Sequence, residues 1–216
     1  MQGRFFTFEG VEACGKSTQA KLLAEWFRQN GRNVREVREP GGTPLGEKLR
    51  DLVKHDPAGV GMAPETELLL MNASRSELVR RVIAPALAAG EVVICDRFYD
   101  STIAYQGWGR QMDLERVRAV IGVAVGEIKP DLTFFVSVSA GTSALRLAAR
   151  RAREQSNQAD RFELEKASFY DRVRAGYRWL IENEPGRIVE IDGNGSIYEV
   201  QALIVAAAKR AAAVPA

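Results

Sequence analysis

Cysteine and histidine are scarce in this sequence, which has two cysteines, Cys14 and Cys95, and one histidine among 216 residues. Two cysteines are too few for a disulfide-linked scaffold, and such sparse use is typical of proteins in a reducing cytoplasm. The chain has no apolar run long enough to span a bilayer and no signal-peptide pattern at its N-terminus. We therefore expect a cytoplasmic protein with no membrane partner.

A large net charge is also lacking, because 30 basic and 28 acidic residues leave a formal charge of only +2. Nothing in this balance favours a nucleic-acid partner. The apolar fraction of 46% and the charged fraction of 27% are ordinary for a globular protein. Neither an internal repeat nor a linker divides the chain, so we predict a single domain over residues 1–216 with a large core.

The most informative segment is Gly10-Val11-Glu12-Ala13-Cys14-Gly15-Lys16-Ser17, followed by Thr18. It fits the phosphate-binding pattern G-x-x-x-x-G-K-[ST] at every fixed position. Before it, Arg4–Glu9 is an aromatic and β-branched run that predicts a buried strand, and after it apolar residues recur at helical spacing over 19–27. A plain glycine turn with an exposed lysine is the simpler alternative, but strand, loop and helix together favour a nucleotide site.

The chemistry of such a loop depends on its glycines. Gly10 and Gly15 allow backbone angles and close approaches that a Cβ would block. Successive amide N–H groups at the start of the helix then form an anion site. We expect this loop to bind a nucleoside triphosphate, with Lys16 reaching the β- and γ-phosphates and Ser17 ligating Mg²⁺.

Strands and helices alternate along the rest of the chain. Further strands are predicted over 33–38, 91–95, 132–138 and 187–192. The intervening helices include a long one over 64–90 with a kink at Pro85, one over 101–109, and one that begins at Phe162. This order predicts right-handed βαβ units and a parallel sheet covered by helices on both faces.

Polar residues end three of the predicted strands, at Glu9, Arg38-Glu39 and Asp96-Arg97. Ligands of such sheets bind outside the carboxyl ends of the strands. There a carboxylate such as Asp96 can hold Mg²⁺ or its waters, and a guanidinium such as Arg97 can bind phosphate in a bidentate way. Of the other arginines, Arg50 and Arg75 are also candidates to face an anionic acceptor.

A second cationic group, Arg150, Arg151 and Arg153, precedes a polar break at 154–160. An arginine run on a helix is usually a solvated face. Phosphoryl transfer, however, gains from cations placed around the migrating group, and lids often supply them on closing. We therefore predict a mobile lid around 150–160 that brings one or two of these arginines to the phosphates.

The motifs taken together resemble those of the bacterial thymidylate kinases, in the same order and spacing, from about Phe5 to Ile204. The segments that carry the resemblance are the glycine loop, Arg38-Glu39-Pro40-Gly41-Gly42-Thr43, Asn72-Ala73-Ser74-Arg75, Asp96-Arg97-Phe98 and Ser101-Thr102-Ile103-Ala104-Tyr105-Gln106-Gly107. The resemblance implies a P-loop NTPase-type, five-stranded parallel sheet flanked by helices, with a lid. It also implies phosphoryl transfer from ATP to dTMP, giving dTDP and ADP, by a homodimer.

Several residue roles follow from the same resemblance. Asp96 helps Ser17 and Lys16 to organise Mg²⁺ and the donor phosphates, and Glu12 lies near the sugar hydroxyl. Glu39, Arg50 and Arg97 surround the acceptor phosphate, whereas Arg75, Ser101, Thr102, Tyr105 and Gln106 approach the base and sugar, with Arg75 and Gln106 reading the base edge. Ala13 stands where some members carry a loop arginine, so the chain resembles the type whose catalytic arginine is in the lid.

One position departs from the family pattern. Met71, four residues before Arg75, stands where the family usually places a phenylalanine to stack on thymine. Methionine can pack on an aromatic ring through its polarisable sulfur, so base binding is expected to survive while base selectivity is left open. A looser pocket would also admit dUMP.

Three alternatives remain open on the residues alone. Within the same chemistry, the chain could phosphorylate another nucleoside monophosphate or a deoxynucleoside. As a different class, it could be a nucleotide-dependent switch, although no Asn-Lys-x-Asp segment for guanine is visible. The apolar helical faces around 65–83 and 113–125 could form a dimer seam or could simply be core.

Overall fold

Five parallel strands form the sheet of the computed structural model, which describes residues 2–154 and 161–213. The strands are β1 (Arg4–Glu9), β2 (Val34–Arg38), β3 (Val92–Asp96), β4 (Leu132–Ser137) and β5 (Ile188–Asp192), in the spatial order β2-β3-β1-β4-β5. Each neighbouring pair is parallel. The predicted fold class, a P-loop NTPase-type sheet flanked by helices, is confirmed.

The helices alternate with these strands. They are α1 (Lys16–Gln29), α2 (Pro44–Lys54), α3 (Pro64–Leu78), α4 (Ala84–Ala88), α5 (Tyr99–Thr102), α6 (Leu114–Val125), α7 (Ala140–Glu154), α8 (Ala167–Asn183) and α9 (Ile197–Ala213). In the described part of the chain, no helix is long and apolar enough to cross a membrane. Residues 155–160 of the predicted lid, and the side chains of Arg150, Arg151 and Arg153, lie outside the described residues.

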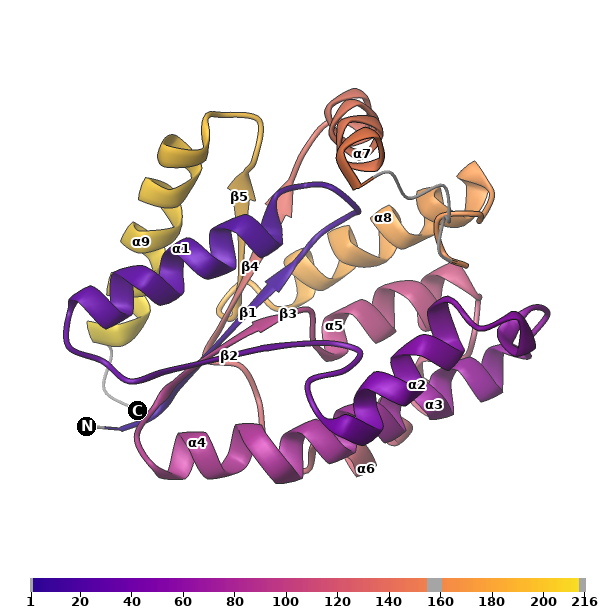
Figure 1. Ribbon diagram of the computed structural model, residues 1–216, viewed down its shortest axis with the longest axis horizontal. Coiled ribbons are helices and arrows are strands. Elements are labelled where there is room, and N and C mark those ends of the chain that lie inside the picture. The colour runs from indigo at the N-terminus through magenta and orange to yellow at the C-terminus, as the bar shows by residue number, and fades with distance from the viewer. Residues whose placement is uncertain (1, 155–160, 214–216) are drawn as a thin grey trace.

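The two faces of the sheet support two separate hydrophobic clusters. Successive side chains of a strand point to opposite faces, so Phe6 and Phe8 of β1 pack with α1 and α9, whereas Phe5 packs with the helices of the other face. Figure 1 shows α1 and α9 on one side of the sheet and α3, α4 and α6 on the other. Both faces are therefore covered, as a parallel sheet requires.

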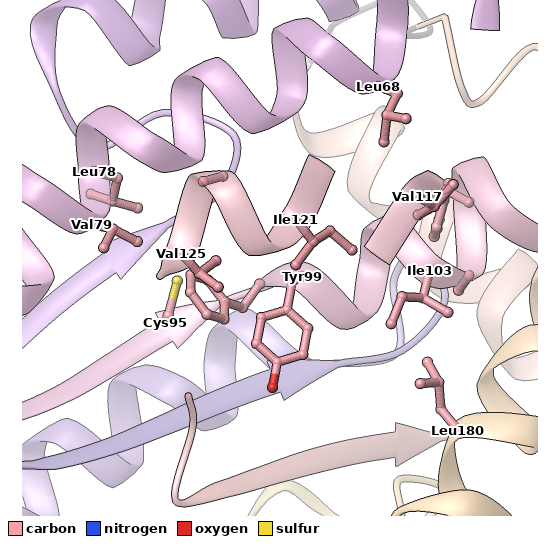
Figure 2. Packing of buried hydrophobic residues seen from close by; sticks show 14 of the residues in the cluster. Leu68, Leu78, Val79, Cys95, Tyr99, Ile103, Val117, Ile121, Val125 and Leu180 are labelled. Carbon is pink, nitrogen blue, oxygen red and sulfur yellow. The ribbon is translucent and has the colours of Figure 1, made fainter. Parts of the chain in front are cut away.

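The larger cluster lies between the sheet and α3, α6 and α8. Figure 2 shows Val117, Ile121 and Val125, which recur at i, i+4 and i+8 on α6, among the side chains of this cluster. All three are at most 6% exposed. This stripe of α6 points inward. Part of the apolar segment 113–125 is therefore buried in the core, which was the simpler of the two alternatives for it.

The long helix predicted over 64–90 is interrupted by a π-helical turn over Val79–Ile83. Here the N–H of Ala84 donates to the carbonyl of Val79, five residues back. Pro85 has no N–H to continue the ordinary ladder, and a widened turn is one way in which helices absorb such a break. Gly90, with φ of 79°, follows the end of α4.

Two other helix predictions need correction. The helix expected over 101–109 begins at Tyr99 as α5 and continues as a π-helical segment, Ile103–Gly109. The helix expected to begin at Phe162 begins only at Ala167, after a turn over 161–165. Phe162 is nevertheless buried, at 4% exposed, because it packs beside Tyr105 with ring centroids 5.9 Å apart.

Candidate active site

The glycine loop joins β1 to α1 in a strained backbone path. Gly10 and Gly15 have φ of 143° and 103°, and Ala13 between them has φ of 56°. A Cβ at Gly10 would lie 2.6 Å from the carbonyl oxygen of Val136, so only glycine fits there. Both glycines have positive φ, a conformation that residues with a Cβ rarely adopt, which is why the sequence pattern requires glycine there.

Lys16 begins α1 and is buried, at 6% exposed. Its Nζ donates to the carbonyl of Val11 at 3.0 Å and lies 3.7 Å from a carboxylate oxygen of Glu12. The lysine is therefore held against the loop that its own backbone completes. An anion in the loop would meet this ammonium group and the N-terminus of α1 together.

The helix that carries the predicted lid arginines touches the loop through an earlier turn. Arg146 of α7 donates to the carbonyls of Cys14 and Gly193, both at 3.1 Å, and Ser143 donates to the carbonyl of Glu12 at 2.7 Å. Arg146 was not predicted. Its spacing of four residues from Arg150, on one helical face, could have identified it.

Ser17 in the first turn of α1 contacts Asp96 at the end of β3. The Ser17 hydroxyl donates to the Asp96 carboxylate, and β3 pairs with β1 so that Asp96 lies opposite Phe8. Within residues 2–154 and 161–213, no three Asp, Glu, His or Cys side chains are grouped as a metal site. A hydroxyl beside one carboxylate nevertheless fits Mg²⁺, which keeps several waters and takes its remaining ligands from substrate phosphate.

Arg97, directly after β3, is at the centre of the most densely bonded part of the site. Its Nη2 donates to Glu12 at 2.7 Å, and its Nη1 donates to Ser101 at 3.0 Å and to the hydroxyl of Tyr177 at 3.2 Å. The guanidinium also lies 5.2 Å from the centroid of the Tyr105 ring. Tyr177 was not among the predicted site residues.

Two carboxyl groups beside Arg97 are perturbed in opposite directions. Burial alone would raise the pKa of Glu12, but the adjacent Arg97 and Lys16 outweigh it and lower that pKa to about 2. Burial raises the pKa of Glu9 despite Arg97, and Asp100 adds to this effect. Glu12 is thus a firmly ionised counter-ion to both cations.

Glu9 ends β1 and is 1% exposed. It accepts hydrogen bonds from the N–H of Phe98 at 2.8 Å, the hydroxyl of Ser101 at 2.5 Å and the hydroxyl of Tyr177 at 2.8 Å. These bonds join β1 to the start of α5 and to α8. Ser101 is therefore held in place in the site by Glu9, at the end of a central strand of the sheet.

Arg75 and Glu39 form a buried pair, at 3% and 7% exposed. Arg75 donates through Nε to Glu39 at 2.8 Å, through Nη1 to Asn72 at 2.6 Å and through Nη2 to Thr102 at 2.9 Å. The other oxygen of Glu39, Oε1, is buried with no hydrogen-bond partner among the described residues. Burial raises the pKa of Glu39 to about 7, although Arg75 acts in the opposite direction.

The carboxyl ends of β1, β2 and β3 border one pocket of about 230 Å³, which some of these groups line. Thirteen of the predicted residues lie on its walls: Glu12, Lys16, Ser17, Glu39, Arg50, Met71, Arg75, Asp96, Arg97, Ser101, Thr102, Tyr105 and Gln106. The loop residues Gly10, Val11, Ala13, Cys14, Gly15 and Thr18 contribute backbone nearby but not pocket wall. Lys54 and Phe162 also line the pocket and were missed as site residues.

Comparison with known proteins agrees on one family. The family model described as thymidylate kinase matches residues 8–204. A thymidylate kinase of Geobacter sulfurreducens is 45% identical over 195 residues, which cover 90% of this chain and 91% of that protein. A thymidylate kinase of Bordetella pertussis is 46% identical over 201 residues, which cover 93% and 92%. A crystal structure of thymidylate kinase from Ehrlichia chaffeensis is similar with a TM-score of 0.76 and 32% identity, covering 97% of this chain and 99% of that one.

Proposed function

The chain belongs to the thymidylate kinase family, and from this premise we propose how its residues divide the transfer of a phosphoryl group from ATP to dTMP, giving dTDP and ADP. The observation that carries the proposal is that Lys16 and Ser17 of the glycine loop share one pocket with Arg97 and Arg75. Two phosphorylated molecules entering from its two ends would meet between these cations.

The donor end of the pocket takes ATP. The amides of the glycine loop and the ammonium group of Lys16 hold its β- and γ-phosphates. Ser17 and Asp96 are the residues that would hold Mg²⁺ (their oxygens are in contact), and the unpartnered Oε1 of Glu39 would accept from one of its waters. When bound, Mg²⁺ neutralises charge on the phosphates. Arg150, Arg151 and Arg153 of the lid add further positive charge there.

The acceptor end takes dTMP. Arg97 and Arg50 bind its phosphate, and Glu39 orders the surrounding water. Glu12 accepts from the sugar hydroxyl, with Tyr105, Ser101 and Thr102 around the sugar and base. Arg75 and Gln106 read the base edge, and Met71 packs on the base face in place of a phenylalanine. Support for this assignment comes from the shared pocket wall.

The reaction needs no strong protein base. The nucleophile is an oxygen of the acceptor phosphate, which carries negative charge already. Catalysis then consists of aligning the two phosphates and neutralising the charge between them, each well-placed cation contributing a few kcal/mol, on the order of 2–4.

We also propose that the protein is a homodimer of the cytoplasm. Leu69 on α3 and Val123 on α6 are 58% and 81% exposed, and α3 packs against α6. The two residues fall within the apolar segments 65–83 and 113–125, which the sequence left open as a dimer seam or core. Both cysteines are free thiols, which agrees with a reducing compartment.

Lys16→Ala tests the donor assignment. We expect a loss of at least about 10²-fold in kcat, because an electrostatic donor to the transferred group is removed while the loop backbone is unchanged. Turnover is followed by ADP release with dTMP as acceptor, and folding by circular dichroism. Lys21→Ala, which removes an exposed lysine of the same helix, is the matched control and should keep full activity. A Lys16→Ala enzyme that works as well as this control would refute the donor site.

A further inference from the structure

Glu67, in the first turn of α3, carries a carboxylate that the functions above do not use. It is 0% exposed and accepts from Nε2 of Gln106 at 2.6 Å. It also pairs with Arg110 at 2.9 Å and with Arg161 at 2.5 Å. One buried carboxylate thus joins three segments that are far apart in the sequence.

We infer that Glu67 is a positioning residue that sets the polarity of the Gln106 amide, and through it the base edge that the pocket accepts. The inference rests on the proposed function, in which Gln106 and Arg75 read the base. Glu67 itself is not on the pocket wall, whereas Gln106 is.

The reasoning starts from the amide of Gln106, which has one end that donates and one that accepts. A carboxylate only accepts, so the NH₂ end must face Glu67. The acceptor, Oε1, is then the end that the amide can offer to a ligand. The reversed amide would set Oε1 against the carboxylate and leave a buried acceptor without a partner, which is strongly unfavourable.

Arg75 supplies the complementary half of the edge, because a guanidinium only donates. Thymine and uracil present a carbonyl acceptor at position 4 and an N–H donor at position 3, which match a donor and an acceptor in that order. Cytosine presents the reverse, an amino donor at position 4 and an acceptor at position 3. The orientation that Glu67 imposes therefore favours thymine and uracil over cytosine.

The surroundings of Glu67 keep it in place. Arg110 is held on its other side by Glu165 at 2.5 Å and lies 4.7 Å from the centroid of the Phe169 ring. Arg161 also donates through Nε to the carbonyl of Val53 at 2.9 Å. With Gln106 only 1% exposed, water has little access to replace the Glu67 bond.

Glu67→Gln tests the inference directly. An amide in this position can donate or accept, so Gln106 becomes free to reverse. We expect the ratio of kcat/KM for dTMP over dCMP to fall about tenfold, the worth of one hydrogen bond. The ratio of dTMP over dUMP and the KM for ATP should stay unchanged, because uracil has the same edge as thymine.

Glu165→Gln is the matched control, since it neutralises the other carboxylate on Arg110 without touching Gln106. Its dTMP over dCMP ratio should equal that of the wild type. In a Gln106→Met background the effect of Glu67→Gln on this ratio should disappear, because the amide through which Glu67 acts is gone.

Glu67→Asp covers the case in which Glu67→Gln does not fold, because it keeps the negative charge for the two arginines but withdraws from Gln106. It should lower the dTMP over dCMP ratio in the same direction. Folded variants that keep the wild-type ratio would overturn the inference. A wild-type protein that does not phosphorylate dTMP would instead overturn the proposed function, so the two failures are distinct.

Discussion

Arg97 has a backbone conformation that is uncommon for a residue with a side chain, with φ of 71°. Its N–H donates to the carbonyl of Phe8 at 2.9 Å, and its guanidinium is held by Glu12 and Ser101. Contacts at both ends of the residue compensate for the strained backbone. Such strain, where it is over-determined by surrounding bonds, tends to occur at functional sites.

Glu39 predicts a pH dependence of stability. Its pKa is about 7 in the folded protein but near 4.5 in an unfolded chain, because burial disfavours the ionised form. The folded state therefore binds this proton more tightly than the unfolded state does. Stability from this group is present below pH 4.5 and decreases as the pH rises to about 7, by at most about 3 kcal/mol.

Glu39→Gln removes this titration. We expect the free energy of unfolding of the wild type to fall relative to that of Glu39→Gln between pH 4.5 and 7, as measured by urea denaturation at several pH values. Glu25→Gln, which changes an exposed carboxyl on α1, should run parallel to the wild type. Parallel curves for Glu39→Gln as well would show that burial does not perturb this carboxyl.

At the scale of elements, α8 supports the π-helical segment that carries Tyr105 and Gln106. The contact is close at Gly176, where a Cβ would lie 2.7 Å from Cγ of Trp108. The next residue, Tyr177, bonds to Glu9 and Arg97. The proposed acceptor end of the pocket is thus formed against one helix, through a position that only glycine fits.

Gly176→Ala should therefore destabilise the protein by about 1–3 kcal/mol, because the added methyl group has no space. The KM for dTMP should rise while that for ATP changes little. Thermal unfolding and two-substrate kinetics measure these effects. Gly141→Ala in α7, where only the Ser139 hydroxyl lies within 4 Å of the added methyl, should be neutral or slightly stabilising. Equal behaviour of the two variants would contradict the close contact.

The elements that could be predicted from the sequence are those that a local residue pattern determines. Short apolar, aromatic and β-branched runs predicted the strands, and the fixed glycines and Lys16 predicted the loop with its neighbouring helix. The π-helical turns were not predicted, because an i to i−5 bond leaves no periodic pattern of its own. Phe162 was predicted to begin a helix, although it lies in a turn and lines the pocket.

Site residues could be predicted where they belong to a short sequence motif. Asp96-Arg97 and Ser101–Gly107 lie in one short stretch, and their order along the chain was enough. Glu67 with Gln106, or Tyr177 with Glu9, are pairs 39 and 168 residues apart. Only the packing of α3 and α8 brings them together, and no single-residue pattern encodes it.

At the scale of the whole molecule, the proposed dimer predicts an effect of surface charge. Val123→Glu places a carboxylate in the proposed seam, and we expect it to shift the protein from two chains to one in sedimentation. Tyr198→Glu changes a residue of similar exposure, 83%, on α9 at the other face of the sheet. It should leave the assembly unchanged. If Val123→Glu does so too, α6 is not part of the seam.

The pairing of β1 with β3 has a consequence for how the family can diverge. Phe8 lies opposite Asp96 in this ladder, and the N–H of Arg97 donates to the carbonyl of Phe8, so main-chain hydrogen bonds of the sheet place the glycine loop beside Arg97. Loops and surface helices can be replaced or lengthened without altering the distance between the glycine loop and Arg97, which is the proposed span of phosphoryl transfer. Variation in loops and surface helices can then change which molecules enter the pocket. The distance between the glycine loop and Arg97 stays the same as long as the sheet does.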